Sequence, residues 1–165
     1  MAIPHRGWTS NSTYFVTASC WEKQSLMQSD RMAQLLIDVL CHYREQKKYL
    51  LHEFVVMPNH FHLLVTPGET LERAMQLVKG GFSFRAKREI GISGEIWQTS
   101  FVDRRVRDMG EYGKIRIYIH QNPVRAGLAE RAEDYPYGSA NLRFQLDDVP
   151  QRLKPVAFSV SGPQG

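Results

Sequence analysis

Apolar runs along the chain predict its strands. Residues 13–20 are rich in β-branched and aromatic side chains, which is typical of a strand. Residues 50–57 and 60–66 are two further apolar runs, and only Pro58-Asn59 separates them, so they are expected to form a hairpin. Residues 96–107 suggest one or two additional short strands.

Helical periodicity fills the intervals between these runs. Ser29 or Asp30 is placed to cap a helix that extends to about residue 48. A second helix is predicted over residues 70–89, although the Gly80-Gly81 pair weakens its middle. A third is predicted over residues 111–121 and is expected to end at Asn122-Pro123, because proline disfavours a helical residue before it.

The resulting order, β-α-β-β-α-β followed by a helix, predicts an α+β fold of the ferredoxin-like type. In that fold an antiparallel sheet carries two helices on one face, and here a C-terminal helix is added. Beyond Tyr135 the chain is Pro-rich and irregular. We therefore expect one domain over residues 1–145 and an irregular tail over residues 146–165.

Composition fits a water-soluble protein of the reducing cytoplasm. In 165 residues there is no apolar run near the ~20 residues of a membrane span, and no basic-then-apolar leader. The two cysteines favour a reducing compartment over a disulfide framework. The net charge is +4, and residues 73–125 hold 11 basic and 5 acidic side chains. On charge alone this local excess favours a solvated basic face, and it also hints at a polyanionic partner.

The His60-Phe61-His62 triplet is the sharpest local motif. Side chains at positions i and i+2 of a strand share a face, so two imidazoles would lie side by side while Phe61 points to the opposite face. Such a pair can bind one divalent ion, but it can also be structural. Two ligands do not complete a metal site, so a third must come from elsewhere in the chain.

Tyr118 and Asn122 lie one turn apart on the third predicted helix. Tyrosine serves as a covalent nucleophile in some enzymes, and an amide oxygen is a hard ligand suited to Mg²⁺ or Mn²⁺. Taken alone, Tyr118 also fits a buried core aromatic, since isoleucines surround it in the sequence.

Together the segments PNHFHLLV and YIHQNPVRAGL resemble the REP-associated tyrosine transposases, which are relatives of the single-tyrosine HUH transposases of bacterial insertion sequences. The resemblance extends from about residue 14 to residue 137 and includes WQTSFVDRRVRD and DYPYGSA. It implies an enzyme that nicks single-stranded DNA and transfers the strand at hairpin-containing repetitive palindromic sequences. It also implies a 5′-phosphotyrosine intermediate.

The resemblance further implies a role for each motif residue. His60 and His62 match the metal ligands, Tyr118 matches the nucleophile, and Asn122 matches the third ligand, although the adjacent Gln121 is an alternative. The expected cofactor is Mg or Mn. The expected partner is single-stranded DNA with hairpins, with no nucleotide cofactor and no membrane, and the protein is expected to be a monomer or a homodimer.

Basic residues near the motifs are expected to contact the DNA backbone, because cations bind phosphates. These candidates are Lys79, Arg85, Lys87, Arg88, Arg104, Arg105, Arg107 and Arg125. Phe82 and Phe84 lie among them, and aromatic rings can stack on bases, but phenylalanine is mostly buried, so we expect both in the core.

Two other functions remain consistent with the sequence. The first is a non-catalytic nucleic-acid-binding module with an RNA-recognition-like fold, since KGGFSF partly matches the aromatic signature of that fold, though out of register. The second is a zinc or iron enzyme acting on small molecules, which would need His52, His120 or Glu53 as a further ligand.

Overall fold

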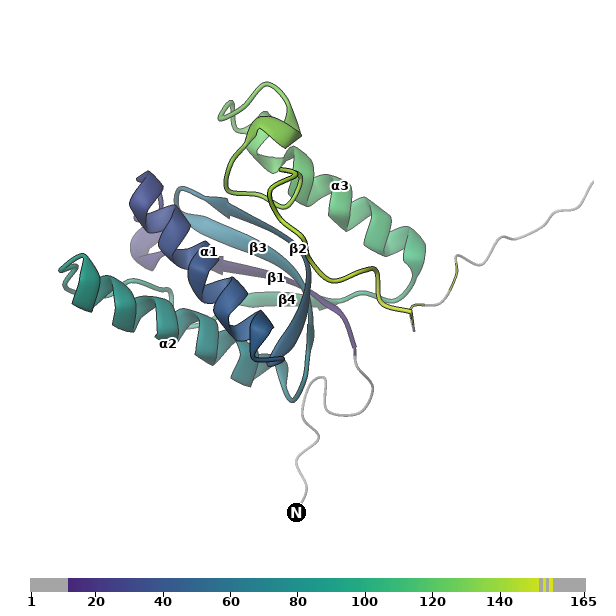
Figure 1. Ribbon diagram of the computed structural model, residues 1–165, viewed down its shortest axis with the longest axis horizontal. Helices are drawn as coiled ribbons and strands as arrows, with labels where there is room; N and C mark the ends of the chain where they lie inside the picture. Colours follow the sequence, from purple (N-terminus) through teal and green to yellow (C-terminus); the bar gives the residue numbers. More distant parts are fainter. Residues whose placement is uncertain (1–11, 152, 154, 156–165) are drawn as a thin grey trace, which may run out of the picture.

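The strands and helices follow the predicted order. The computed structural model describes residues 12–151, 153 and 155, and none of the helices there has the length and apolarity to cross a membrane. The described elements (Figure 1) are β1 (Tyr14–Ser19), η1 (Trp21–Lys23), α1 (Asp30–Glu45), β2 (Tyr49–Met57), β3 (His60–Pro67), α2 (Leu71–Glu89), β4 (Val102–Arg105), α3 (Met109–Arg125) and η2 (Ala132–Asp134).

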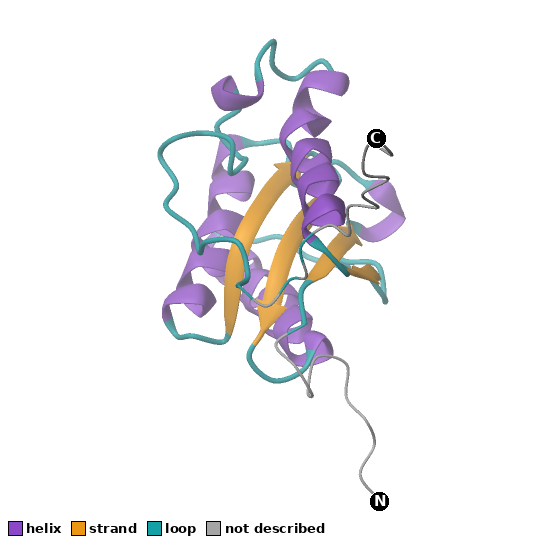
Figure 2. Cartoon of the chain, turned by 90° about the vertical axis from the view of Figure 1, so that its right-hand side faces the viewer, coloured by secondary structure: helices purple, strands orange, loops and turns teal. Residues whose placement is uncertain are grey.

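The four strands form one antiparallel sheet in the order β2-β3-β1-β4. Helices α1 and α2 pack together on one face, whereas α3 lies across β2 and β3 on the other, as Figures 1 and 2 show. This arrangement confirms the predicted ferredoxin-like α+β fold with an added C-terminal helix.

Strand β3 separates two hydrophobic clusters. Phe61, Leu63 and Val65 pack into the large cluster beneath α1 and α2, while Leu64 belongs to the smaller cluster beneath α3. The alternation places His62 on the α3 face, which is the face where a second layer covers only part of the sheet. The fold therefore puts most of its stabilising core on one face and leaves the other for polar groups.

Helix capping explains where the first two helices begin. Ser29 Oγ accepts a hydrogen bond from the amide of Met32, and Thr70 Oγ1 accepts one from the amide of Arg73. These bonds satisfy backbone donors of the first turn that have no partner within the helix. Helix α1 ends at Glu45, three residues before the predicted limit. The glycines do not interrupt α2. A Cβ on Gly81 would lie 2.9 Å from the Tyr43 ring, so glycine permits close packing of α1 against α2.

The predicted end of the third helix is wrong, because α3 continues through Pro123 to Arg125. In the last turn a proline removes only one backbone hydrogen bond, and its ring is buried in the apolar face of the helix. The chain leaves the helix through Gly127, two residues after Arg125, where a φ of 74° suits glycine, and the amide of Leu128 donates to the Pro123 carbonyl at 2.8 Å. This is a Schellman motif.

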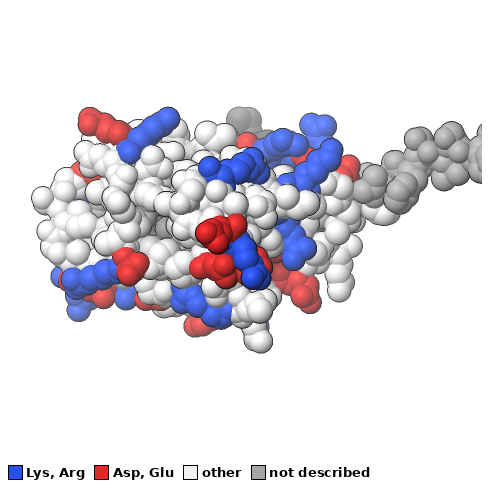
Figure 3. All heavy atoms as spheres, turned by 90° about the horizontal axis from the view of Figure 1, so that it is seen from above, with Lys and Arg blue, Asp and Glu red and all other residues white. Residues whose placement is uncertain are grey.

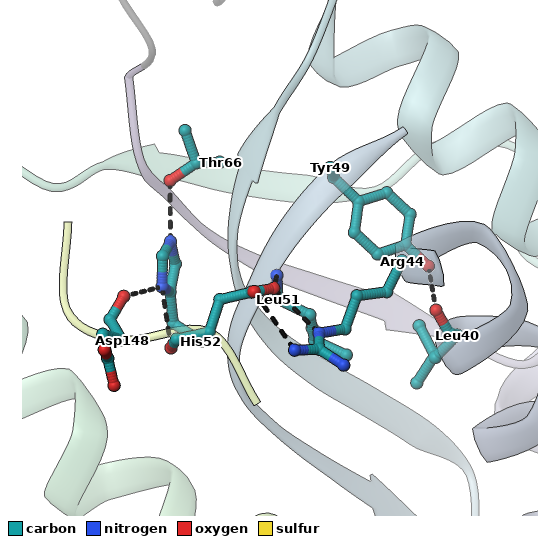
Figure 4. Close-up of polar contacts among 8 residues, drawn as sticks. Leu40, Arg44, Tyr49, Leu51, His52, Thr66 and Asp148 are labelled. Carbon is teal, nitrogen blue, oxygen red and sulfur yellow. Dashed lines mark hydrogen bonds and ion pairs between the residues drawn. The ribbon is translucent and has the colours of Figure 1, made fainter. Parts of the chain in front are cut away.

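The chain after α3 returns to cover the outer edge of β2. The Val56 amide donates to Tyr137 O at 2.8 Å, and Val55 forms a β-bridge with Gly138. Further along, Asp147 binds the guanidinium of Arg44 and accepts a hydrogen bond from the amide of Leu51. Figure 4 shows Arg44 and Leu51 in this region. The start of the predicted tail therefore packs on the sheet, and residues 152, 154 and 156–165 lie outside the described part.

Candidate active site

Two imidazoles lie side by side at the start of β3. The ring centroids of His60 and His62 are 4.8 Å apart. Phe61, between them, is fully buried in the opposite cluster, as the period of a strand predicts. Nδ1 of His60 is bonded to Asn59 Oδ1 at 2.7 Å, which leaves Nε2 of His60 as the nitrogen available to a ligand.

His62 carries an unpaired buried nitrogen. Its Nδ1 lies 2.8 Å from Thr17 Oγ1, but its Nε2 has no hydrogen-bond partner, and no other buried side-chain nitrogen or oxygen of the described residues lacks one. Burial, with a smaller contribution from neighbouring His60, lowers the pKa of His62 to about 3. The ring is thus neutral at pH 7, and its free lone pair is suited to a metal ion.

Tyr118 reaches the same place from α3. Its ring meets the His62 ring edge-on at 5.4 Å between centroids and the Phe15 ring at 5.9 Å. With 38% of its surface exposed, the side chain is open to a substrate and is not the core aromatic that the sequence also allowed. The guanidinium carbon of Arg125 lies 4.9 Å from the centre of the Tyr118 ring.

Asn122 is a half-buried residue one turn after Tyr118, and it remains helical because α3 continues through Pro123. Gln121 is exposed on the next position round the helix. Burial therefore distinguishes the two amides, and Asn122 is the less exposed of the two. Its part in binding a metal stays a prediction.

The residues considered for a zinc or iron site have other partners. His52 is bonded through both ring nitrogens, to Asp148 O at 2.7 Å and to Thr66 Oγ1 at 2.8 Å. His120 Nε2 is bonded to Glu53 Oε1 at 2.5 Å. Across residues 12–151, 153 and 155, no three His, Cys, Asp or Glu side chains gather in a group that could hold a metal ion. A third ligand to the His60-His62 pair would therefore have to be of another kind.

The predicted DNA-contacting cations do not form one continuous surface. Four of them lie on α2, behind the sheet as seen from Tyr118, and the other four lie on β4, between β4 and α3, and on α3. On α2, Lys79 donates to Gln98 O at 2.8 Å and Arg85 pairs with Glu89 at 2.7 Å. The view over α3 in Figure 3 shows Lys and Arg side chains gathered on part of that face, with acidic side chains among them. Their contact with DNA stays a prediction.

The two phenylalanines of α2 differ in exposure. Phe82 is fully buried against Trp97, as predicted, but the prediction for Phe84 is wrong, because 64% of its surface is exposed. Phe82 points into the core, and Phe84, two positions later on the helix, points outward. KGGFSF lies in a helix and not on a central strand, so the aromatic platform of an RNA-recognition fold is absent from this segment.

Sequence reasoning missed Thr17 and Phe15, which complete the site from β1. Both sit on the α3 face, since Thr17 pairs with His62 and Phe15 with Leu64. In the sequence, the one indication of this role is a polar Thr17 between two apolar neighbours. It does not identify His62 as the partner of Thr17, because the partner of a strand residue depends on the register of the strands, which the sequence does not state.

Known proteins resemble this chain in sequence and in fold. Residues 9–122 match the family model described as "Transposase IS200 like". A protein of Escherichia coli (strain K12) named REP-associated tyrosine transposase is 24% identical over 168 residues, covering 96% of this chain and 92% of the relative. A Haemophilus influenzae protein is 24% identical over 170 residues, covering 92% of each chain.

Among solved structures, the REP-associated tyrosine transposase bound to a REP hairpin superposes with a TM-score of 0.68. The two chains are 21% identical, and the match covers 91% of this chain and 92% of the other. At this identity the likeness establishes the shared fold.

Proposed function

Because this chain belongs to the IS200-like transposase family, we propose that it nicks single-stranded DNA at hairpin-containing repeats and transfers the strand, with Tyr118 as the nucleophile. One observation carries the proposal. A buried imidazole nitrogen without a partner, Nε2 of His62, lies beside an exposed tyrosine that comes from a different element. Such an unpaired group is costly in a core and is retained where it binds something.

The residues present fit a divalent metal ion. His60 and His62 offer neutral imidazole nitrogens, and Asn122 would add an amide oxygen, a donor set suited to Mg²⁺ or Mn²⁺ when water completes the shell. Thr17 holds the ring of His62 in its orientation through Nδ1. When bound, the metal would supply positive charge that polarises a phosphate and stabilises its transition state.

Tyr118 performs the covalent step. Its phenolic oxygen loses a proton and forms a bond to phosphorus, while the bond from phosphorus to the 3′ oxygen breaks and that oxygen takes up a proton. The products are a 5′-phosphotyrosine and a free 3′-hydroxyl. One phosphodiester replaces another, so a 3′-hydroxyl can reverse the step and join a strand without a nucleotide cofactor.

Arg125 is the cation best placed to assist. Its guanidinium lies against the Tyr118 ring, so a phosphate that approaches the phenolic oxygen also comes within reach of a bidentate donor. Arg104 lies on the same sheet face through its pairing with Phe15, although Glu111 already binds it. The substrate class, hairpin-containing single-stranded DNA, is supported by the solved relative that is bound to a REP hairpin.

The decisive experiment is capture of the covalent adduct. Wild-type protein, a labelled hairpin oligonucleotide and Mg²⁺ or Mn²⁺ are expected to give a protein–DNA band that resists denaturation, and chelation of the metal should prevent it. Tyr118→Phe is expected to abolish the band while DNA binding survives, because only the attacking oxygen is lost.

Tyr112→Phe is the matched control, since Tyr112 lies on the same helix but is buried. This variant is expected to form the adduct. If Tyr118→Phe still formed the adduct, another tyrosine would be the nucleophile. If the wild type formed none, the proposed chemistry would be wrong.

A further inference from the structure

Glu53 joins β2 to the helix that carries Tyr118. Its Oε1 accepts hydrogen bonds from His120 Nε2 at 2.5 Å and from Ser139 Oγ at 2.7 Å. Its Oε2 lies 3.3 Å from Nε of Arg116. Burial opposes ionisation of Glu53, but these hydrogen bonds and positive charges hold the pKa of the carboxyl below its ordinary value. The side chain is therefore a carboxylate that binds two groups of α3 and one of the returning chain.

A bulge in β2 gives Glu53 this direction. The pairing of β2 with β3 shifts between Leu51 and Glu53, which leaves His52 as an extra residue. The two consecutive side chains therefore both contact residues of α3: the His52 ring lies 6.2 Å from the Tyr112 ring, and Glu53 binds His120. Bulges of this kind often redirect side chains next to active sites.

Ser139 holds the carboxylate in place from the other side. Its Oγ accepts the amide of Phe54 at 2.9 Å, and its own amide donates to Phe54 O at 2.9 Å. The hydroxyl that binds Glu53 is thus fixed to the backbone of β2 itself. Because Glu53 is only 13% exposed, water competes weakly for these bonds.

The contacts of α3 explain why this matters for Tyr118. Ile119 is fully buried against the sheet, and its two neighbours in sequence flank it: Tyr118 faces His62 and His120 faces Glu53. Side-chain tips lie about 5–6 Å from a helix axis, so a rotation of roughly 10° moves them by about 1 Å. A displacement of that size can slow a positioned reaction about 100-fold.

We propose that Glu53 is a positioning residue, which binds His120 and thereby sets the rotation of α3 that aligns the Tyr118 oxygen beside His62. The inference rests on the proposed nucleophilic role of Tyr118. The apolar contacts of Ile119 alone tolerate small rotations of α3, because the hydrophobic effect is not directional. The short hydrogen bond between Glu53 and His120 is directional and does not tolerate such rotations.

The kinetic test compares Glu53→Gln with Asp147→Asn in the full chain. Asp147 is a partly buried carboxylate that also binds β2, through Leu51, but pairs with Arg44 of α1 and not with α3. With a saturating hairpin oligonucleotide and Mg²⁺, Glu53→Gln is expected to slow single-turnover adduct formation by about 10- to 100-fold, because it removes the negative charge that strengthens the bond to His120 and pairs with Arg116. Its DNA affinity should change less than about twofold, and Asp147→Asn should keep the wild-type rate despite a comparable loss of thermal stability.

Rescue separates orientation from simple loss of stability. His120→Gln retains an N–H donor for Glu53, so it is expected to keep a larger share of the rate than His120→Ala. A wild-type rate in Glu53→Gln, or a rate that falls only in proportion to DNA affinity, would overturn the positioning role. Equal rates in His120→Gln and His120→Ala would do the same.

A readout without catalysis distinguishes this inference from the proposed function. In protein labelled with 3-fluorotyrosine, the ¹⁹F signal missing from Tyr118→Phe reports the surroundings of Tyr118. Glu53→Gln is expected to shift or broaden it, and Asp147→Asn to leave it in place. A shifted signal in protein that forms no adduct would retain Glu53 as the helix anchor and remove Tyr118 as the nucleophile. An unshifted signal would overturn the inference even if adducts formed.

Discussion

His52 and His62 are buried imidazoles on neighbouring strands, 2% and 4% exposed, and both lie beneath α3. His52 binds through both nitrogens, whereas His62 keeps Nε2 without a partner. The first lies at the end of the sheet covered by the returning chain, and the second lies where Tyr118 is open to a substrate. The same residue type under the same helix is thus structural where its bonds are complete and available for chemistry where one is missing.

Exchanging the two histidines for alanine should separate these roles most strongly. His62→Ala removes a proposed metal ligand, so cleavage is expected to fall by more than the roughly 100-fold that loss of an outer partner of a ligand costs. His52→Ala breaks two buried hydrogen bonds and is expected to cost about 2–4 kcal/mol of unfolding free energy. Adduct assays and chemical denaturation measure the two effects.

Comparable losses of cleavage in folded His52→Ala and His62→Ala protein would contradict the assignment of a structural role to His52 and a chemical role to His62. The double variant adds a control, because sites with separate functions should give nearly additive changes in unfolding free energy.

The hydroxyls that bind the two rings offer a finer comparison. Thr17→Val frees Nδ1 of His62 and is expected to weaken metal affinity by about 10- to 100-fold. Thr66→Val makes the same substitution beside His52 and should lower stability while metal affinity stays unchanged. Titration calorimetry with Mn²⁺ measures the affinities. An equal effect of both substitutions on affinity would show that the hydroxyl of Thr17 has no special part in the site.

Acid should reveal the smallest of the three differences. Burial lowers the pKa of His52 below its ordinary value, so the unfolded chain binds a proton that the folded chain refuses once the pH falls below about 6.5. The unfolding free energy therefore decreases as the pH decreases, by at most about 1.4 kcal/mol per pH unit for this one group. His52→Gln should flatten that slope between pH 7 and pH 5, as measured by urea denaturation. An unchanged slope would show that protonation of His52 does not cause it.

The elements that the sequence predicts well are those with local signals. The strand triplet around Phe61, the caps at Ser29 and Thr70, and the order of the elements all follow from short-range periodicity and side-chain chemistry. The predicted end of α3 at Pro123 is wrong, because the helix runs to Arg125 and the chain turns away at Gly127. Pro123 and Gly127 both stand in the sequence, and only the burial of the proline ring decides between them.

Local sequence patterns do not predict features that depend on strand register or on pairing between distant residues. The bulge at His52, which turns Glu53 toward α3, arises from how β2 pairs with β3. The Arg104–Glu111 pair joins a strand to a helix, so spacing in the sequence does not reveal it. Even Phe82 and Phe84, two residues apart, differ in burial because only one of them faces Trp97. Register and packing partners are properties of the assembled sheet.

The position of Ser139 in the chain has a consequence for protein synthesis. A ribosome makes the strands, α1 and α2 first, then α3, and only afterwards the serine that fixes Glu53. The sheet and its large core can therefore fold on a nascent chain while the anchor of α3 is still incomplete. With the proposed role of Glu53, the proposed nucleophile is aligned only after residue 139 has emerged, so translation products that stop before it would form the covalent adduct slowly.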